Sequence, residues 1–197
     1  MQNAKIPTST LLVLAARLKA LSSVISDFRI FARLFGLIGI YTWAKDVWSN
    51  PGSDGVEDRL VKAQVIVNFF FQILENGAYL ASKNVLNWSE SKQNKAWLWS
   101  SRFWASHVFL EFLRLGRVWN VHSREVVEGK GKEKEVDAER RQREWRKEWT
   151  KNLIVNSAWA PLTLHWSKDG GLISDTWVGT FGSVAGVVGV GRLLGYA

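Results

Sequence analysis

Residues 11–35 read LLVLAARLKALSSVISDFRIFARLF, and apolar side chains recur in this stretch every three or four positions. Spacing of that kind lines up one side of an α-helix. The apolar side would be formed by Leu11, Leu14, Leu18, Leu21, Ile25, Phe28, Ala32 and Phe35. On the other side fall largely Ser22, Ser26, Arg29 and Arg33. The stretch therefore predicts an amphipathic helix in the N-terminal region.

The rest of the chain also follows a helical pattern. No stretch alternates apolar and polar residues for long enough to predict a strand, so the predicted fold class is all-α. Clusters of turn-forming or polar residues interrupt the pattern at 49–55, 87–94 and 170–171. We expect an N-terminal amphipathic region, an apolar helical hairpin, a charged segment and a C-terminal membrane segment, at residues 1–48, 56–122, 123–151 and 152–197.

The composition narrows the class of protein. The chain has 197 residues, 12 of them tryptophan, and it has no cysteine. Without cysteine there is no disulfide framework and no thiolate metal site. Tryptophan favours membrane–water interfaces, and the net charge of +8 favours an anionic partner. That partner is either nucleic acid or the anionic phospholipid of a membrane surface.

The distribution of charge separates these two partners. The densest run, residues 124–151, has 10 basic and 8 acidic residues, so its charges nearly cancel. A surface that follows a phosphate backbone would be more strongly basic. The sequence therefore predicts a membrane partner and no nucleic acid. It also predicts that this run is a solvent-exposed, cytosol-facing loop or helix, because burying so many charges in lipid is prohibitive.

The C-terminal segment is rich in glycine and almost uncharged. Gly182 and Gly186 form a GxxxG pattern, which allows close approach of helices within a membrane and predicts self-association there. The longest uncharged runs, 152–167 and 176–191, have 16 residues each, close to the roughly 18 needed to span a bilayer. We expect a glycine-rich membrane helix; the alternative is a flexible glycine-rich tail.

A row of polar residues lies in the apolar background of the third stretch: Asn68, Gln72, Glu75, Asn76, Tyr79 and Lys83. Their spacing puts them on one helix side. In a membrane that side would face partner helices. An ordinary solvated side and a transport path are the alternatives.

Catalytic and metal-binding patterns are missing from the sequence. His107 and Glu111 have the i, i+4 spacing of a ligand pair, but no third ligand lies nearby, so a simple polar pair is the better interpretation. No nucleophile elbow, P-loop or dinucleotide fingerprint is present. We expect neither an enzyme nor a cofactor.

Several segments together resemble a known family: ARLKALSS at 16–23, RIFARLFGLIGIYTWAK at 29–45, LENGAYLASKNV at 74–85, WSSRFWA at 99–105 and LEFLRLGR at 110–117. They resemble the peroxin-eleven family of peroxisomal membrane-elongation proteins. Within that family they are most similar to the third-type branch of filamentous fungi. The resemblance covers most of the chain.

The resemblance implies a peroxisomal membrane protein, multi-pass or tightly associated, with cytosolic termini. It implies elongation of the membrane by amphipathic-helix insertion and self-association, and promotion of peroxisome proliferation and fission. The fission machinery, a dynamin-related protein and its adaptor, would be a partner. The matching helix spans residues 26–48, and its expected membrane-binding residues are Arg29, Phe31, Arg33, Phe35 and Lys45.

Two other functions stay open from the sequence. The polar row between Asn68 and Lys83 could line a channel for small metabolites. Alternatively, the chain could be a soluble helical adaptor that binds a partner through its charged segment.

Overall fold

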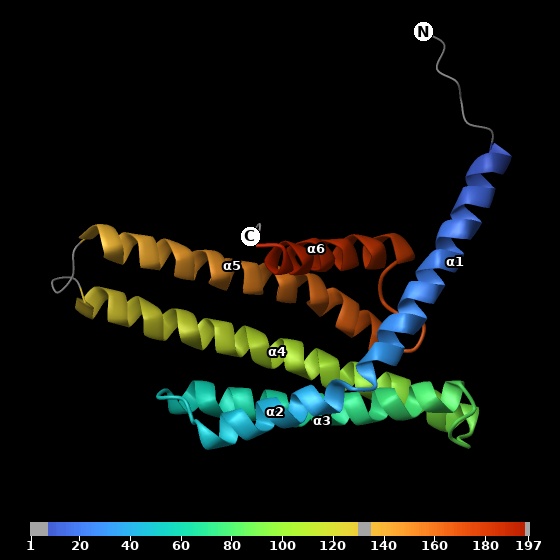
Figure 1. Ribbon diagram of the computed structural model, residues 1–197, viewed down its shortest axis with the longest axis horizontal. Helices are drawn as coiled ribbons and strands as arrows, with labels where there is room; N and C mark the ends of the chain where they lie inside the picture. The colour runs from blue at the N-terminus through green and yellow to red at the C-terminus, as the bar shows by residue number, and fades with distance from the viewer. Residues whose placement is uncertain (1–7, 130–134, 196–197) are drawn as a thin grey trace, which may run out of the picture.

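The computed structural model describes residues 8–129 and 135–195, and within these residues it consists of six α-helices without a strand (Figure 1). The helices are α1 (Thr8–Arg33), α2 (Gly36–Ser49), α3 (Gly55–Ser82), α4 (Glu90–Gly129), α5 (Glu135–Trp166) and α6 (Asp175–Leu193). The predicted all-α fold class is confirmed for this part of the chain.

Five of the helices form a layered bundle. The long α4 lies between α3 on one side and α5 on the other, α2 packs on α3, and α6 packs on α5 (Figure 1). Small and aliphatic side chains fill the buried seams: Ala78 on α3, Val108 and Leu115 on α4, and Ala158 and Leu162 on α5. Helix α1 projects away from the bundle and meets it near its C-terminal end (Figure 1).

Tryptophan rings hold α4 and α5 together at two levels. Trp104 contacts Trp159 and Trp166, with ring centroids 4.9 and 5.6 Å apart. Further along the helices, Trp119 contacts Trp145 and Trp149 at 5.6 and 4.7 Å. Aromatic pairs of this kind stabilise a helix interface beyond the area they bury. Much of the tryptophan content therefore serves packing within the bundle, and the composition alone had suggested membrane interfaces.

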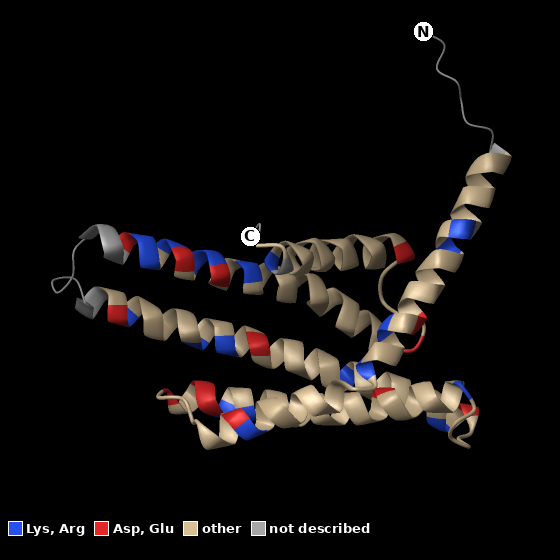
Figure 2. Cartoon of the chain, in the orientation of Figure 1, with Lys and Arg blue, Asp and Glu red and all other residues tan. Residues whose placement is uncertain are grey.

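The helix ends agree with the turn signals. Helix α2 ends at Ser49, α3 ends at Ser82, and α5 ends before Gly170 and Gly171, which both have positive φ. Asp54 caps α3, because its side chain accepts the Val56 N–H at 3.3 Å. Helix α5 continues through residue 151, so the predicted border between the charged and C-terminal segments is not a break in the chain. Its charged first half alternates basic and acidic residues (Figure 2).

One predicted element is wrong. The sequence predicts a continuous helix over residues 26–48, but the structure divides it between α1 and α2. The chain turns at Leu34 and Phe35, where the Leu34 N–H donates to Phe31 O at 3.0 Å and the Ile38 N–H to Phe35 O at 3.1 Å. These are tighter i→i−3 bonds that close a helix end.

The predicted glycine-rich helix is present as α6, but its predicted crossing of a membrane is not supported. Among the described residues, none of the helices combines the length and the apolar character that a bilayer requires. Five of the 19 residues of α6 are glycine, and three more are Thr or Ser, which lowers its hydrophobicity. The expectation of a multi-pass chain therefore has no support in the described structure.

Candidate membrane-binding surface

Helix α1 carries an apolar surface that the bundle does not cover. Every residue from Ser9 to Arg29 is exposed. Ten large apolar side chains of this helix are among the exposed ones: Leu11, Leu12, Val13, Leu14, Leu18, Leu21, Val24, Ile25, Phe28 and Phe31. Exposed apolar area of this extent on one element marks an interaction site.

The surface continues onto α2. Phe35, in the turn before α2, and Ile38, Tyr41 and Trp48, on α2, are exposed, whereas Leu37 is half-buried. We refer to the exposed apolar side chains of α1, together with Phe35, Ile38 and Tyr41, as the α1–α2 apolar surface. Figure 2 shows that few charged positions interrupt α1. Its four cations are Arg17, Lys19, Arg29 and Arg33.

Side-chain amides of α3 hold the joint between α1 and α2. The Gln72 Nε2 donates to the main-chain oxygen of Arg33 at 2.8 Å, and the Asn76 Nδ2 donates to that of Leu34 at 3.1 Å. These carbonyls lie at the end of α1, where the helix itself supplies no partner. Gly36 allows the close approach, because a Cβ there would lie 2.5 Å from Gln72 Oε1. The joint is therefore fixed by α3.

Two ion pairs add to this attachment. Arg33 Nη2 lies 3.1 Å from Glu75 Oε1, and Lys83 Nζ lies 2.7 Å from Asp27 Oδ1. Burial raises the pKa of Glu75 above its usual value, although Arg33 opposes the shift. Burial lowers the pKa of Arg33, and repulsion from Arg29 adds to that effect. The Asp27–Lys83 pair is exposed and contributes little to stability.

The predicted membrane-binding residues do not form one group. Phe31 and Phe35 are 48% and 64% exposed, and their rings meet edge to face at 6.4 Å across the joint. Lys45 is exposed on α2, and Arg29 is exposed on α1. Arg33 instead faces α3 and is held by Glu75. The structure thus leaves four of the five predicted residues available to a surface.

The predicted oligomerisation glycines lie on α6. A Cβ added at Gly182 or Gly186 would meet no atom within 4 Å. The contacts of α6 with α5 therefore do not use these two positions.

Most of the polar row of α3 faces neighbouring helices of the bundle, and Gln64, four residues before Asn68, extends it. Gln64 donates to Glu111 at 2.7 Å, and Asn68 lies 2.7 Å from His107 Nδ1. Arg114 bonds Glu111 at 2.7 Å as well. Burial lowers the pKa of His107. Burial also acts to raise the pKa of Glu111, but bonds from Arg114 and Gln64 hold it below its usual value.

His107 and Glu111 therefore bond separate partners on α3 and do not act as a ligand pair. In the part of the chain that the structure describes, no group of three His, Asp or Glu side chains could hold a metal ion. The side chains that a channel would need are used in bonds between helices.

A comparison with protein-family models decides the family. Residues 11–194 match the model described as "Peroxisomal biogenesis factor 11 (PEX11)", which covers nearly the whole chain. The chain belongs to the PEX11 family. The resemblance predicted from the sequence is confirmed, and a role in peroxisome biogenesis follows from the family.

One curated relative of this PEX11-family chain is an uncharacterized protein of Schizosaccharomyces pombe. It is 29% identical over 176 residues, covering 88% of this chain and 75% of the relative. A fungal relative is consistent with the predicted branch. No solved structure matches the chain.

Sequence reasoning missed which partners hold α1 in this PEX11-family chain. The polar row predicted that Gln72, Glu75, Asn76 and Lys83 face other helices, but not that they meet residues 39 to 56 positions earlier. The available signal for these contacts was Asp27, the one acidic residue in α1, because it needs a basic partner such as Lys83.

Proposed function

We propose that this PEX11-family chain elongates the peroxisomal membrane by inserting the α1–α2 apolar surface into one leaflet. The observation that carries the proposal is the exposure of every residue from Ser9 to Arg29. Nine of these residues are large and apolar, and Phe31 is a tenth on the same helix. An amphipathic helix at an interface buries its apolar side about 5–10 Å deep. Insertion into one leaflet expands that leaflet relative to the other, so the membrane curves.

Burial contributes more to this binding than charge. A large apolar side chain stabilises by about 1.5–3 kcal/mol when fully buried. A cation near an anionic membrane contributes about 1 kcal/mol. Since α1 has ten exposed large apolar side chains and only three cations besides Arg33, which is paired with Glu75, apolar insertion dominates and charge assists.

The bundle gives the inserted helix a defined attachment. Gln72, Asn76 and Glu75 hold the α1–α2 joint, so the surface is presented from one place on the bundle. Self-association through Gly182 and Gly186 would gather several such helices on one patch of membrane. The chain would then be tightly associated with the cytosolic side of the peroxisomal membrane and would recruit the dynamin-related protein and its adaptor.

The test is overexpression of tagged variants with imaging of peroxisome shape and measurement of protein abundance. The variant Phe31→Ser/Phe35→Ser should lose peroxisome elongation at normal abundance. Phe109→Ser is the matched control, because Phe109 is exposed on α4 outside the α1–α2 apolar surface. Arg17→Gln/Lys19→Gln measures the part played by charge and should only weaken elongation.

Two results would contradict the proposal. Elongation by the phenylalanine variant at normal abundance would exclude insertion of this surface. Loss of elongation in the Arg17/Lys19 variant alone would replace insertion by electrostatic docking.

A further inference from the structure

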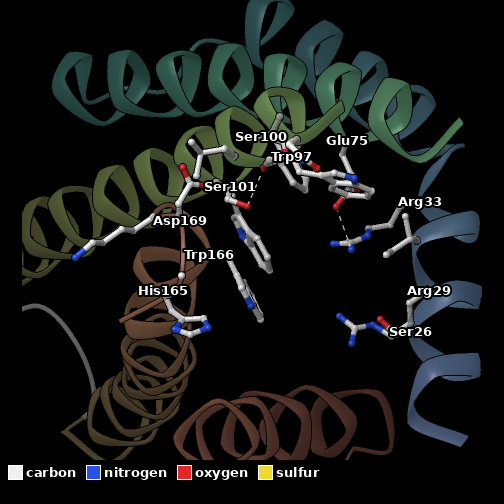
Figure 3. Close-up of a pocket in the computed structure, with 18 residues that line it drawn as sticks. Ser26, Arg29, Arg33, Glu75, Trp97, Ser100, Ser101, His165, Trp166 and Asp169 are labelled. Atoms are coloured by element: carbon white, nitrogen blue, oxygen red, sulfur yellow. Dashed lines mark hydrogen bonds and ion pairs between the residues drawn. The ribbon is translucent and has the colours of Figure 1, made fainter. Parts of the chain in front are cut away.

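A half-open cavity of about 540 Å³ lies where α1 meets the bundle (Figure 3). Helix α1 lines it with Ser26, Arg29, Ile30 and Arg33, which recur at three- and four-residue steps and share one helix side. Arg29 and Arg33 extend from α1 toward the wall that carries Trp166 and His165 (Figure 3). The volume is in the range of sites that bind small molecules.

The charges lining the cavity do not cancel. Arg33 is paired with Glu75 at 3.1 Å. Lys168 and Asp169 are adjacent in the chain and offset each other. Arg29 is left over, since within the described residues its guanidinium makes no hydrogen bond or short ion pair and acts on Glu75 only through the longer-range attraction of its charge. One monoanionic group would neutralise the cavity.

Two buried polar atoms beside Arg29 also have no partner among the described residues. They are the Nε of Arg33 and the Oε2 of Glu75. Buried polar atoms are nearly always hydrogen-bonded, so each unpaired one calls for an explanation. The Arg33 Nε–H is a donor suited to a phosphate oxygen, and the Glu75 oxygen is an acceptor suited to a hydroxyl group.

The lining away from α1 includes several aromatic and apolar side chains. Trp97, Trp104 and Trp166 belong to it, and the rings of Trp104 and Trp166 stack at 5.6 Å. Phe71 and Leu98 lie in the same lining. Polar residues such as Ser101 and His165 lie in this lining too. A free phosphate ion would leave the indole rings without contacts, whereas the glycerol and first acyl carbons of a lipid would cover them.

We propose that this cavity binds the headgroup of one anionic phospholipid that carries a hydroxyl beside its phosphodiester, as phosphatidylglycerol and phosphatidylinositol do. Arg29 and the Arg33 Nε–H contact the phosphate, and Glu75 Oε2 accepts the headgroup hydroxyl. The inference rests on the proposed function, since the membrane supplies the lipid, and it names the lipid class that the base of α1 selects.

The test is calorimetric titration of the purified full-length chain with short-chain lipids below their micelle concentration. Dihexanoyl phosphatidylglycerol should bind about tenfold more tightly than dihexanoyl phosphatidylcholine, which lacks the net charge and the hydroxyl. It should also bind about tenfold more tightly than inorganic phosphate, which lacks the apolar part.

Two pairs of variants locate the site. Arg29→Gln should weaken phosphatidylglycerol binding about tenfold, whereas Arg17→Gln, the same change further along α1, should not. Ser26→Trp fills the cavity without altering charge and should abolish binding. Ser22→Trp is its matched control, because Ser22 is exposed and does not line the cavity. Melting temperatures without lipid show that each variant folds.

Each contrary result overturns a part of the proposal. Equal affinity for phosphatidylglycerol and phosphatidylcholine would mean that the lipids bind through apolar contacts alone, without recognition of the headgroup. Equal binding of inorganic phosphate would mean a free-anion site. Unchanged affinity in Arg29→Gln or Ser26→Trp would exclude the cavity. Peroxisome elongation is measured separately, so failure of the lipid site and failure of the proposed function are distinguishable.

Discussion

The side-chain amide of Gln72 donates a 2.8 Å hydrogen bond to the main-chain oxygen of Arg33, and this bond ties the end of α1 to the middle of α3. Gln72 is buried, and it also donates to Asn76 Oδ1 at 2.7 Å. Asn76 in turn reaches the oxygen of Leu34. Two bonds thus connect α3 to the end of α1 and the turn after it, and a third, within α3, links their two donors.

Replacing Gln72 should loosen this joint. We expect Gln72→Leu to lower the free energy of unfolding by about 1–3 kcal/mol, because the Arg33 oxygen would be left unpaired. Urea denaturation measures the loss, and amide hydrogen exchange at residues 34–38 should accelerate more than elsewhere. Gln93→Leu on α4 is the control, since the Gln93 side chain has no hydrogen bond among the described residues. Equal losses in both variants would show that the bond has no special role.

Removing Arg33 should leave Glu75 as an unpaired buried carboxylate. We expect Arg33→Met to lower the free energy of unfolding by about 3 kcal/mol. This value is at the lower end for buried ion pairs, because the Glu75 side chain is 6% exposed but that of Arg33 is 33% exposed. Arg33→Met/Glu75→Leu should recover most of the loss. Urea denaturation of both variants measures the loss of stability and its recovery.

Acidification should also rescue the single variant. Without Arg33 the pKa of Glu75, already raised by burial, rises further. Between the unfolded pKa of about 4.3 and the folded pKa, the folded state binds more protons than the unfolded state, so stability increases as the pH falls. A loss that did not depend on pH would contradict this account.

The Asp54–Arg117 pair should make stability depend on pH in the opposite direction. A hydrogen bond from Arg117, at 2.7 Å, lowers the pKa of Asp54 to about 2. Its contribution is present above the unfolded pKa of about 3.9 and is lost as the pH falls toward 2. Asp54→Asn retains an N-cap group without the charge. Wild type should therefore be more stable than Asp54→Asn at pH 6, and the difference should vanish near pH 2 in urea denaturation.

Much of the fold follows from local sequence signals. The three- and four-residue apolar spacing predicted helices, and turn formers predicted where α2, α3 and α5 end. The polar row that includes Gln72 and Glu75 predicted contacts with other helices, because polar groups in an apolar background need partners. These signals lie within a few residues of the structure they determine.

The rest depends on contacts between distant residues. No proline or glycine directly precedes the turn at Leu34. The turn is held by a side-chain amide of α3, because Asn76 donates a hydrogen bond to the Leu34 main-chain oxygen. An apolar stripe such as that of α1 looks the same in sequence whether it is covered or exposed. The cavity at the base of α1 combines residues from four helices, among them Arg29 and Trp166, and no local pattern connects them.

Larger residues on α6 should prevent self-association without harming the fold. A side chain at Gly182 or Gly186 would enter open space, and replacing glycine within a helix stabilises it by up to about 1 kcal/mol. We expect Gly182→Leu/Gly186→Leu to keep or raise the melting temperature while chemical cross-linking into dimers falls. Gly116→Leu on α4, also open in the structure, is the control. Undiminished cross-linking would show that the contact between copies lies elsewhere.

The placement of the tryptophans has an optical consequence. All twelve follow α1 in the chain, and Trp104, Trp159 and Trp166 lie close enough for their excited states to couple. Ultraviolet emission of tryptophan from this chain therefore originates outside α1, from both buried and exposed rings. Quenching of that emission by brominated acyl chains would register Trp48 on α2, whereas the depth of α1 itself can be read only from a label attached there, such as a dye on a cysteine introduced into this cysteine-free chain.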